Sequence, residues 1–147
     1  MKITEALLAE HMVFHNLFDR VEWLASRLST LAEVRVCASL MAAMLHDHSV
    51  MEDELLMHPL EHCLSQLGQA DNIHHEHDAI EAQLAAAESA RQLKSARAAL
   101  LQAVQLARQH FDKEERVIFP LADRQFNATT QTALRKRWEQ RRKTAAQ

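Results

Sequence analysis

The feature that most limits the fold of this chain is its shortage of turn-forming residues. Its 147 residues include one Gly and two Pro. Tight turns between β-strands depend on Gly and Pro, so a fold built from many strands is excluded. The length fits one compact domain with a sizeable core. We therefore expect an all-α protein.

Apolar residues recur with helical spacing along nearly the whole chain, which predicts an up-down-up-down four-helix bundle. The expected helix caps are Thr4, a capping box of Thr30 with Glu33, Asp71, and a second capping box of Ser89 with Gln92. The expected helix ends lie near Pro59, Gly68 and Pro120. A short fifth helix is predicted from about Thr130 to Lys143. Residues 1–126 would form the bundle and residues 127–147 a basic C-terminal helix or tail.

Six residues with metal-binding chemistry interrupt the apolar faces of the four long helices. They are His11, His48, Glu52, His77, His110 and Glu114. Each Glu follows a His by four residues, so the two side chains share one face of a helix. Burying a carboxylate in an apolar core is costly unless a cation or a hydrogen-bond partner compensates it. The pattern therefore predicts a metal site in the bundle core.

The positions of the four histidines indicate that they lie at one level. The midpoint of each consecutive pair falls at or near a turn signal: the Thr30 cap, the segment from Pro59 to Gly68, and the residues after Ser89. Antiparallel helices bring residues equally distant from a turn to the same height. Glu-His and His-x-x-x-Glu motifs also recur in the same order in both halves of the chain. Two similar hairpins predict a pseudo-two-fold dinuclear site, with a local bulge absorbing one extra residue between Glu52 and Pro59.

The ordered motifs resemble the hemerythrin-like (HHE cation-binding) family over about residues 4–121. The resemblance is carried by Glu10-His11 followed by LFDRVE, HSVMED from His48, EHDAIEAQL around His77, and HFDKEERVIFP from His110. It implies two non-haem Fe ions with an oxo or hydroxo bridge, the four histidines as terminal ligands, and Glu52 and Glu114 as bridging carboxylates. Mn or Zn occupancy stays open. The implied ligand is a small diatomic molecule, O₂ or NO, in sensing, storage or a stress response.

The chain departs from the oxygen-carrying hemerythrins in two places. Ile73 stands where they have a further His, and Glu114 and Glu115 lie four and five residues after His110, where they use an Asp at five. The pattern is closer to members with four His and two Glu, so iron–sulfur repair or a di-iron oxidoreductase activity on this scaffold stays an alternative. A ferritin-like enzyme is disfavoured because the chain has no Glu-x-x-His motif.

Several side chains near the predicted site are expected to support it. His15 and Glu81, each one turn after a predicted ligand, would orient ligands from outside the metal shell. Phe14, Met44 and Met51 would keep the site dry. The other five histidines have no assigned role.

Charge and composition limit the partners. The net charge of −3 makes nucleic acid an unlikely partner, and no apolar segment is long enough to span a membrane. The start of the chain lacks the pattern of a signal peptide, and two isolated Cys are typical of a cytoplasmic protein. The segment from Ala128 has six Lys or Arg and one acidic residue. It is expected to be a solvated helix docked through Leu134 and Trp138, with an anionic protein partner, or a metal-sensing regulatory role, as the alternative.

Overall fold

A computed structural model describes residues 1–145, all α-helical or π-helical apart from short turns and the chain start. The elements in order are α1 (Ile3–Ala25), α2 (Leu31–Glu52), η1 (Asp53–Met57), α3 (His58–Gln66), α4 (Ala70–Ser89), α5 (Leu93–Lys113), η2 (Glu114–Ile118), α6 (Phe119–Gln125) and α7 (Ala128–Ala145). The last two residues of the predicted C-terminal segment, 146 and 147, lie outside the described part.

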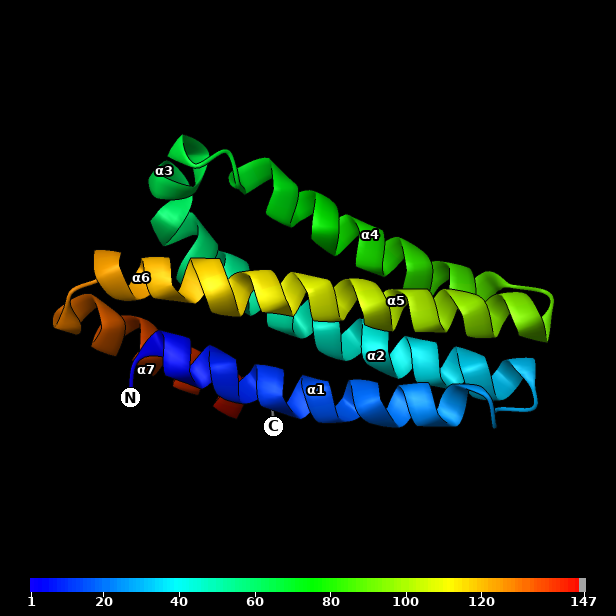
Figure 1. The fold of residues 1–147 in the computed structure, drawn as a ribbon. Helices are drawn as coiled ribbons and strands as arrows, with labels where there is room; N and C mark the ends of the chain where they lie inside the picture. Colours follow the sequence, from blue (N-terminus) through cyan, green and yellow to red (C-terminus); the bar gives the residue numbers. More distant parts are fainter. Residues whose placement is uncertain (146–147) are drawn as a thin grey trace.

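Helices α1, α2, α4 and α5 run lengthwise beside one another in an up-down-up-down bundle (Figure 1). This confirms the all-α fold class that the hydrophobic pattern predicted. Near its N-terminus α4 diverges from the bundle, and α3 turns away from the bundle axis beside it (Figure 1). Helix α7 returns along α1 and η1. None of the helices within residues 1–145 is both long enough and apolar enough to cross a membrane.

The predicted helix-capping residues are confirmed at some helix ends and are wrong at others. The Thr30–Glu33 capping box is present, with both reciprocal hydrogen bonds formed, and Gly68 supplies the positive φ of the α3–α4 turn. The predicted Thr4 cap was wrong, because the N-cap of α1 is Lys2, two residues earlier, and the buried Thr4 hydroxyl donates to Asp123 instead. Asp71 lies inside the first turn of α4, whose N-cap is Gln69.

The turn between α4 and α5 also differs from the expected one. Ser89 is the last residue of α4, and its hydroxyl donates to the carbonyl of Ala85 rather than capping a new helix. Gln92 is the N-cap of α5. The predicted second capping box is therefore wrong, because the Ser89 hydroxyl donates within α4 and does not cap α5.

A π-helical turn follows each of the two predicted carboxylate positions. The turn η1 begins directly after Glu52 and η2 begins at Glu114. A π-turn adds one residue to the helix and rotates the residues that follow it. Consequently Ile118 is buried and Val117 is 43% exposed, whereas uninterrupted α-helical spacing from His110 and Glu114 would place Val117 on the buried face. A π-turn is thus present in both halves of the chain, so the bulge expected in one half alone does not account for the extra residue between Glu52 and Pro59.

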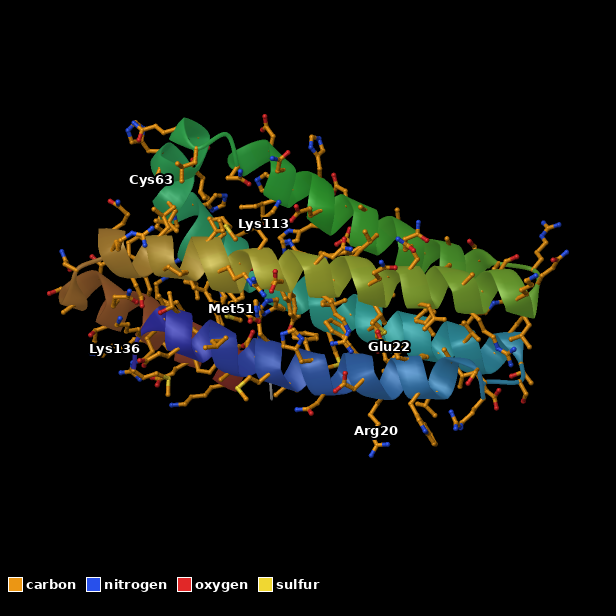
Figure 2. The ribbon with its side chains drawn as sticks, viewed as in Figure 1. Arg20, Glu22, Met51, Cys63, Lys113 and Lys136 are labelled. Atoms are coloured by element: carbon orange, nitrogen blue, oxygen red, sulfur yellow. The ribbon has the colours of Figure 1, made fainter. Side chains whose placement is uncertain are left out.

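Two apolar clusters fill the bundle, one above and one below a polar level. The first includes Phe14, Leu45 and Phe111, and the second includes Leu7 and Leu55. Side chains from all four long helices reach this interior (Figure 2). Along each long helix the predicted metal-binding residues lie where the buried side chains change from one cluster to the other, so apolar side chains flank them in both directions.

Candidate metal centre

The six predicted residues meet at the level between the two apolar clusters. We call them the buried cluster; they are His11, His48, Glu52, His77, His110 and Glu114. All are buried except His77, which is half-buried. The structure groups them into two sets of four potential ligand atoms, each set lying within 4.8 Å, and both sets contain Glu52 and Glu114. The expected common level of the four histidines therefore agrees with the structure.

Each set contains a pair of imidazoles whose Nε2 atoms face each other. The distance between these atoms is 3.1 Å for His11 and His48, and 2.8 Å for His77 and His110. Two nitrogens that bind one ion at right angles, with bonds of about 2.1 Å, lie about 3 Å apart. The spacing of both pairs therefore fits two ligands of a single cation.

The shared carboxylates lack the partners that burial normally requires. Among residues 1–145, no donor gives a well-directed hydrogen bond to either oxygen of Glu52 or Glu114, although Oε1 of Glu114 lies 2.8 Å from Nε2 of His110. Both side chains are fully buried. Uncompensated buried carboxylates are costly, and a bound cation removes that cost. The two buried carboxylates and the imidazoles beside them therefore form a set of donors that suits metal ions.

The protonation of the buried cluster is uneven. Burial and the neighbouring charge of Glu114 raise the pKa of Glu52 well above its ordinary value. Burial also opposes ionisation of Glu114, but the attraction of His110 outweighs it and lowers the pKa of Glu114 to about 2. Despite burial, Glu114 and Glu76 raise the pKa of His110 to about 9. Burial lowers the pKa of His11 and of His77 to about 4. Neutral imidazoles are the form that binds metal.

A second set of carboxylates contacts three of the imidazoles at Nδ1, the ring nitrogen that faces away from the centre of the cluster. The carboxylate contacts to Nδ1 are Glu10 to His48 at 2.7 Å, Glu76 to His110 at 2.8 Å and Glu115 to His11 at 3.0 Å. Such contacts direct Nε2 toward the interior and increase the basicity of the ring. This role of the three carboxylates was not predicted from the sequence. The recurring Glu-His dipeptides were the available signal, since the Glu before each His reaches the next helix.

The prediction for His15 agrees with the structure, and the prediction for Glu81 does not. Nε2 of His15 lies 3.0 Å from the same Glu115 oxygen that contacts His11. His15 therefore acts on the buried cluster through Glu115, as expected of a residue outside the metal shell. Glu81 instead contacts the exposed His46 at 3.3 Å. The prediction for Glu81 was wrong, because its side chain points to the surface of the bundle.

Aromatic rings shield the buried cluster from water. Phe111 stacks on His11 with ring centroids 3.8 Å apart and planes 6° apart. Phe14 and Met51 are buried beside it, as expected. Met44 is 42% exposed and does not cover the site, contrary to expectation. Phe111 directly follows a predicted ligand, and its position there was not recognised in the sequence.

The basic helix α7 contacts the layer of outer carboxylates. Nε1 of Trp138 donates to Oε1 of Glu10 at 2.7 Å, and Arg142 donates to the same oxygen at 2.6 Å. Arg137 and Arg141 pair with Glu54. Several charges of this segment are therefore compensated by acids of the bundle, and Leu134 is buried against it, as the docked-helix interpretation expected.

A four-helix bundle with paired imidazoles and shared carboxylates in its core belongs to the class of metal-binding helical bundles. The comparison with family models identifies the family. The hemerythrin HHE cation-binding domain matches residues 2–122, and a second, overlapping match covers residues 68–145. The chain belongs to this family. No curated protein and no solved structure matches the chain.

Proposed function

We propose that the buried cluster holds two iron ions and that the loaded protein binds O₂ or NO. The observation that carries this proposal is the arrangement of two facing imidazole pairs around two buried carboxylates that both sets share. His11 and His48 would hold one ion, and His77 and His110 the other. Glu52 and Glu114 would bridge them. Iron held in this way binds diatomic molecules at coordination positions that the protein leaves free.

The chain's own residues supply charge, orientation and exclusion of water. The two carboxylates offset part of the charge of two divalent ions. Glu10, Glu76 and Glu115 hold the imidazole rings in the orientation that points Nε2 inward. Phe111 and Phe14 line the interior near His11 and exclude solvent. A dry, neutralised site favours reversible binding of a small uncharged molecule.

The donor types favour iron over structural zinc. Structural zinc sites are four-coordinate and rich in thiolate, whereas neither Cys37 nor Cys63 belongs to the buried cluster. Imidazole and carboxylate donors with open positions suit non-haem iron, and also accept Mn. Both cysteines are free thiols, which fits the cytoplasmic location that we propose.

Anaerobic reconstitution with Fe²⁺ tests this proposal. The metal content is measured per chain, and optical and Mössbauer spectra are recorded before and after O₂ or NO is added. We expect two Fe per chain and a spectral change with at least one of the two gases. Fewer than about 1.5 Fe per chain would contradict a dinuclear centre. Consumption of NO or peroxide over many turnovers would favour an enzyme instead of a binding protein.

A further inference from the structure

The buried cluster is least covered at His77. The other five members are buried, but His77 is half-buried. It lies on α4, which diverges from the bundle in the half that contains this residue (Figure 1). Among the six members, His77 is therefore the one that a cation from solvent would meet with least cover.

A third group of ligand atoms lies on this side. Asp53, His74 and His77 each offer one ligand atom within 4.8 Å of the others. His77 also belongs to the buried cluster, so it lies between that cluster and His74. Oδ1 of Asp53 is buried and has no hydrogen-bond partner within residues 1–145. The group therefore has an unsatisfied carboxylate oxygen beside an accessible imidazole.

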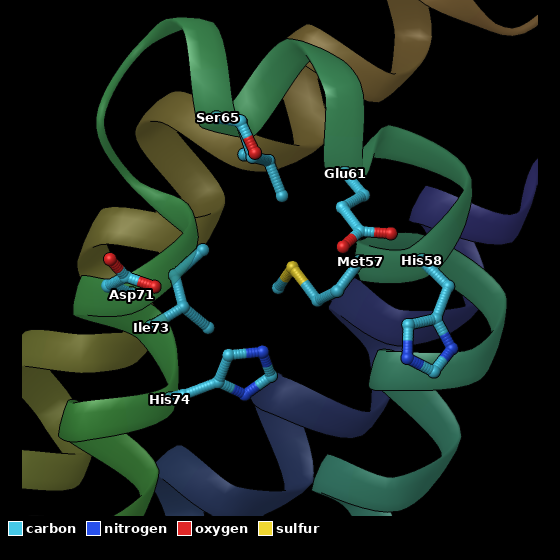
Figure 3. Close-up of a pocket in the computed structure, with 8 residues that line it drawn as sticks. Met57, His58, Glu61, Ser65, Asp71, Ile73 and His74 are labelled. Carbon is cyan, nitrogen blue, oxygen red and sulfur yellow. The ribbon is translucent and has the colours of Figure 1, made fainter.

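His74 also lines a pocket that opens to solvent between α3 and α4. This cavity of about 260 Å³ is bordered by His58, Glu61 and Asp71. In Figure 3 the ring of His74 extends from α4 into the pocket, and His58 and Glu61 come from the facing helix. Carboxylates that line a cleft raise the local concentration of cations. The pocket thus leads from solvent to His74 through groups that attract and bind metal ions.

The two halves of the chain differ at this point. Glu115 corresponds to Asp53 in the internal repeat and is bound by His11 and His15. Leu8 corresponds to His74, since both precede a cluster histidine by three residues. The side of the buried cluster at His11 is therefore closed by the Glu115 hydrogen bonds and an apolar residue. The side at His77 carries the exposed imidazole of His74 and an unpartnered Asp53 oxygen in their place.

We propose that Asp53 and His74 form an entry site where a divalent metal cation binds from solvent before it passes His77 into the buried cluster. This inference rests on the proposed function, because it needs a metal centre to supply. The cation exchanges water for an Asp53 oxygen and a His74 nitrogen at the surface. His77 belongs both to the group with Asp53 and His74 and to the buried cluster, so it would bind the cation next, on the way to the interior. The route requires no opening of the apolar clusters.

The rate of metal uptake tests the entry site. Metal-free full-length protein is mixed anaerobically with Co²⁺ in a stopped-flow instrument, and the absorbance of bound Co²⁺ is followed. We expect His74→Ala to slow uptake by about tenfold, with the same final Co²⁺ content and spectrum as wild type. Asp53→Asn is expected to slow it in the same way. His75→Ala is the matched control, since His75 is also exposed on α4 but lines a separate pocket beside Glu76 and His110.

An unchanged rate in His74→Ala overturns the entry site, as does an equal slowing in His75→Ala. Loss of Co²⁺ from His74→Ala at equilibrium also contradicts it, because His74 would then hold a resident ion. The proposed function fails separately if the wild-type protein binds fewer than two ions at equilibrium. The two failures are distinguished by the final metal content, which the entry site leaves unchanged.

Discussion

Trp138 donates its indole N–H to Oε1 of Glu10, and Oε2 of the same carboxylate contacts Nδ1 of His48 at 2.7 Å. Arg142 also donates to Oε1 of Glu10. Burial would raise the pKa of Glu10, but the contacts with His48 and Arg142 outweigh it and lower that pKa to about 2. The last helix of the chain is therefore connected through one carboxylate to a ligand-type imidazole in the buried cluster.

This connection predicts that Arg142→Gln weakens metal binding without touching the buried cluster. A less firmly held Glu10 orients His48 less well, and loss of such outer contacts costs about 10-fold or more in metal affinity. Titration against a competing chelator measures the change. Arg141→Gln is the matched control, because Arg141 lies next to Arg142 on α7 but pairs with Glu54 instead of Glu10. Equal affinities in the two variants would show that α7 does not act through Glu10.

Loss of a shared carboxylate and loss of a histidine are expected to change the number of bound metal ions by different amounts. Glu52 belongs to both ligand sets, whereas His77 belongs to only one of them. Glu52→Gln should therefore reduce binding at both metal positions, while His77→Ala should remove about one ion per chain. Metal analysis after reconstitution gives the content directly. His62→Ala, an exposed histidine bonded to Gln66, should retain two ions; a loss there would point to non-specific binding.

The buried cluster was predictable from sequence because helical periodicity determines which residues face the core. His48 and Glu52 share a face by spacing alone, whatever the neighbouring helices do. The outer contacts were not predictable in the same way, since Glu10 reaches His48 only if the two helices have a particular rotation and height. The sequence indicated a bulge only between Glu52 and Pro59. The π-turn at Glu114 has no local sequence signal, so the burial of Ile118 in place of Val117 could not be anticipated.

Glu52 is expected to lower the stability of the metal-free protein. Its carboxyl is fully buried, has no well-directed hydrogen bond among the described residues and lies next to Glu114. Glu52→Met keeps a similar volume and removes the polar group, which should raise the free energy of unfolding of the metal-free chain by ~1–3 kcal/mol. Urea unfolding measures this. Addition of metal should stabilise the wild type and not the variant; a metal-free variant less stable than wild type would contradict the argument.

The metal-free protein should lose stability as the pH falls from 6.5 toward 4.5. His11 and His77 have an ordinary pKa of 6.5 but about 4 in the fold, because burial disfavours their charged forms. Below pH 6.5 the unfolded chain therefore binds two more protons at these residues. Glu52 opposes this with one proton, since its raised pKa keeps it protonated in the fold. Near pH 5.5 the net difference of about one proton gives a loss of roughly 1.4 kcal/mol per pH unit, and toward pH 4.5 Glu10 and Glu114, whose pKa is about 2 in the fold, make the loss steeper.

His77→Gln separates these contributions. Without the His77 imidazole the unfolded chain has one fewer extra proton, so near pH 5.5 the stability should fall less steeply than in the wild type, by roughly 1.4 kcal/mol per pH unit. Thermal or urea unfolding at several pH values, with a chelator present, measures the slope for both proteins. A wild-type chain that becomes more stable on acidification would reverse the expected sign, and an equally steep slope in His77→Gln would remove this imidazole from the explanation.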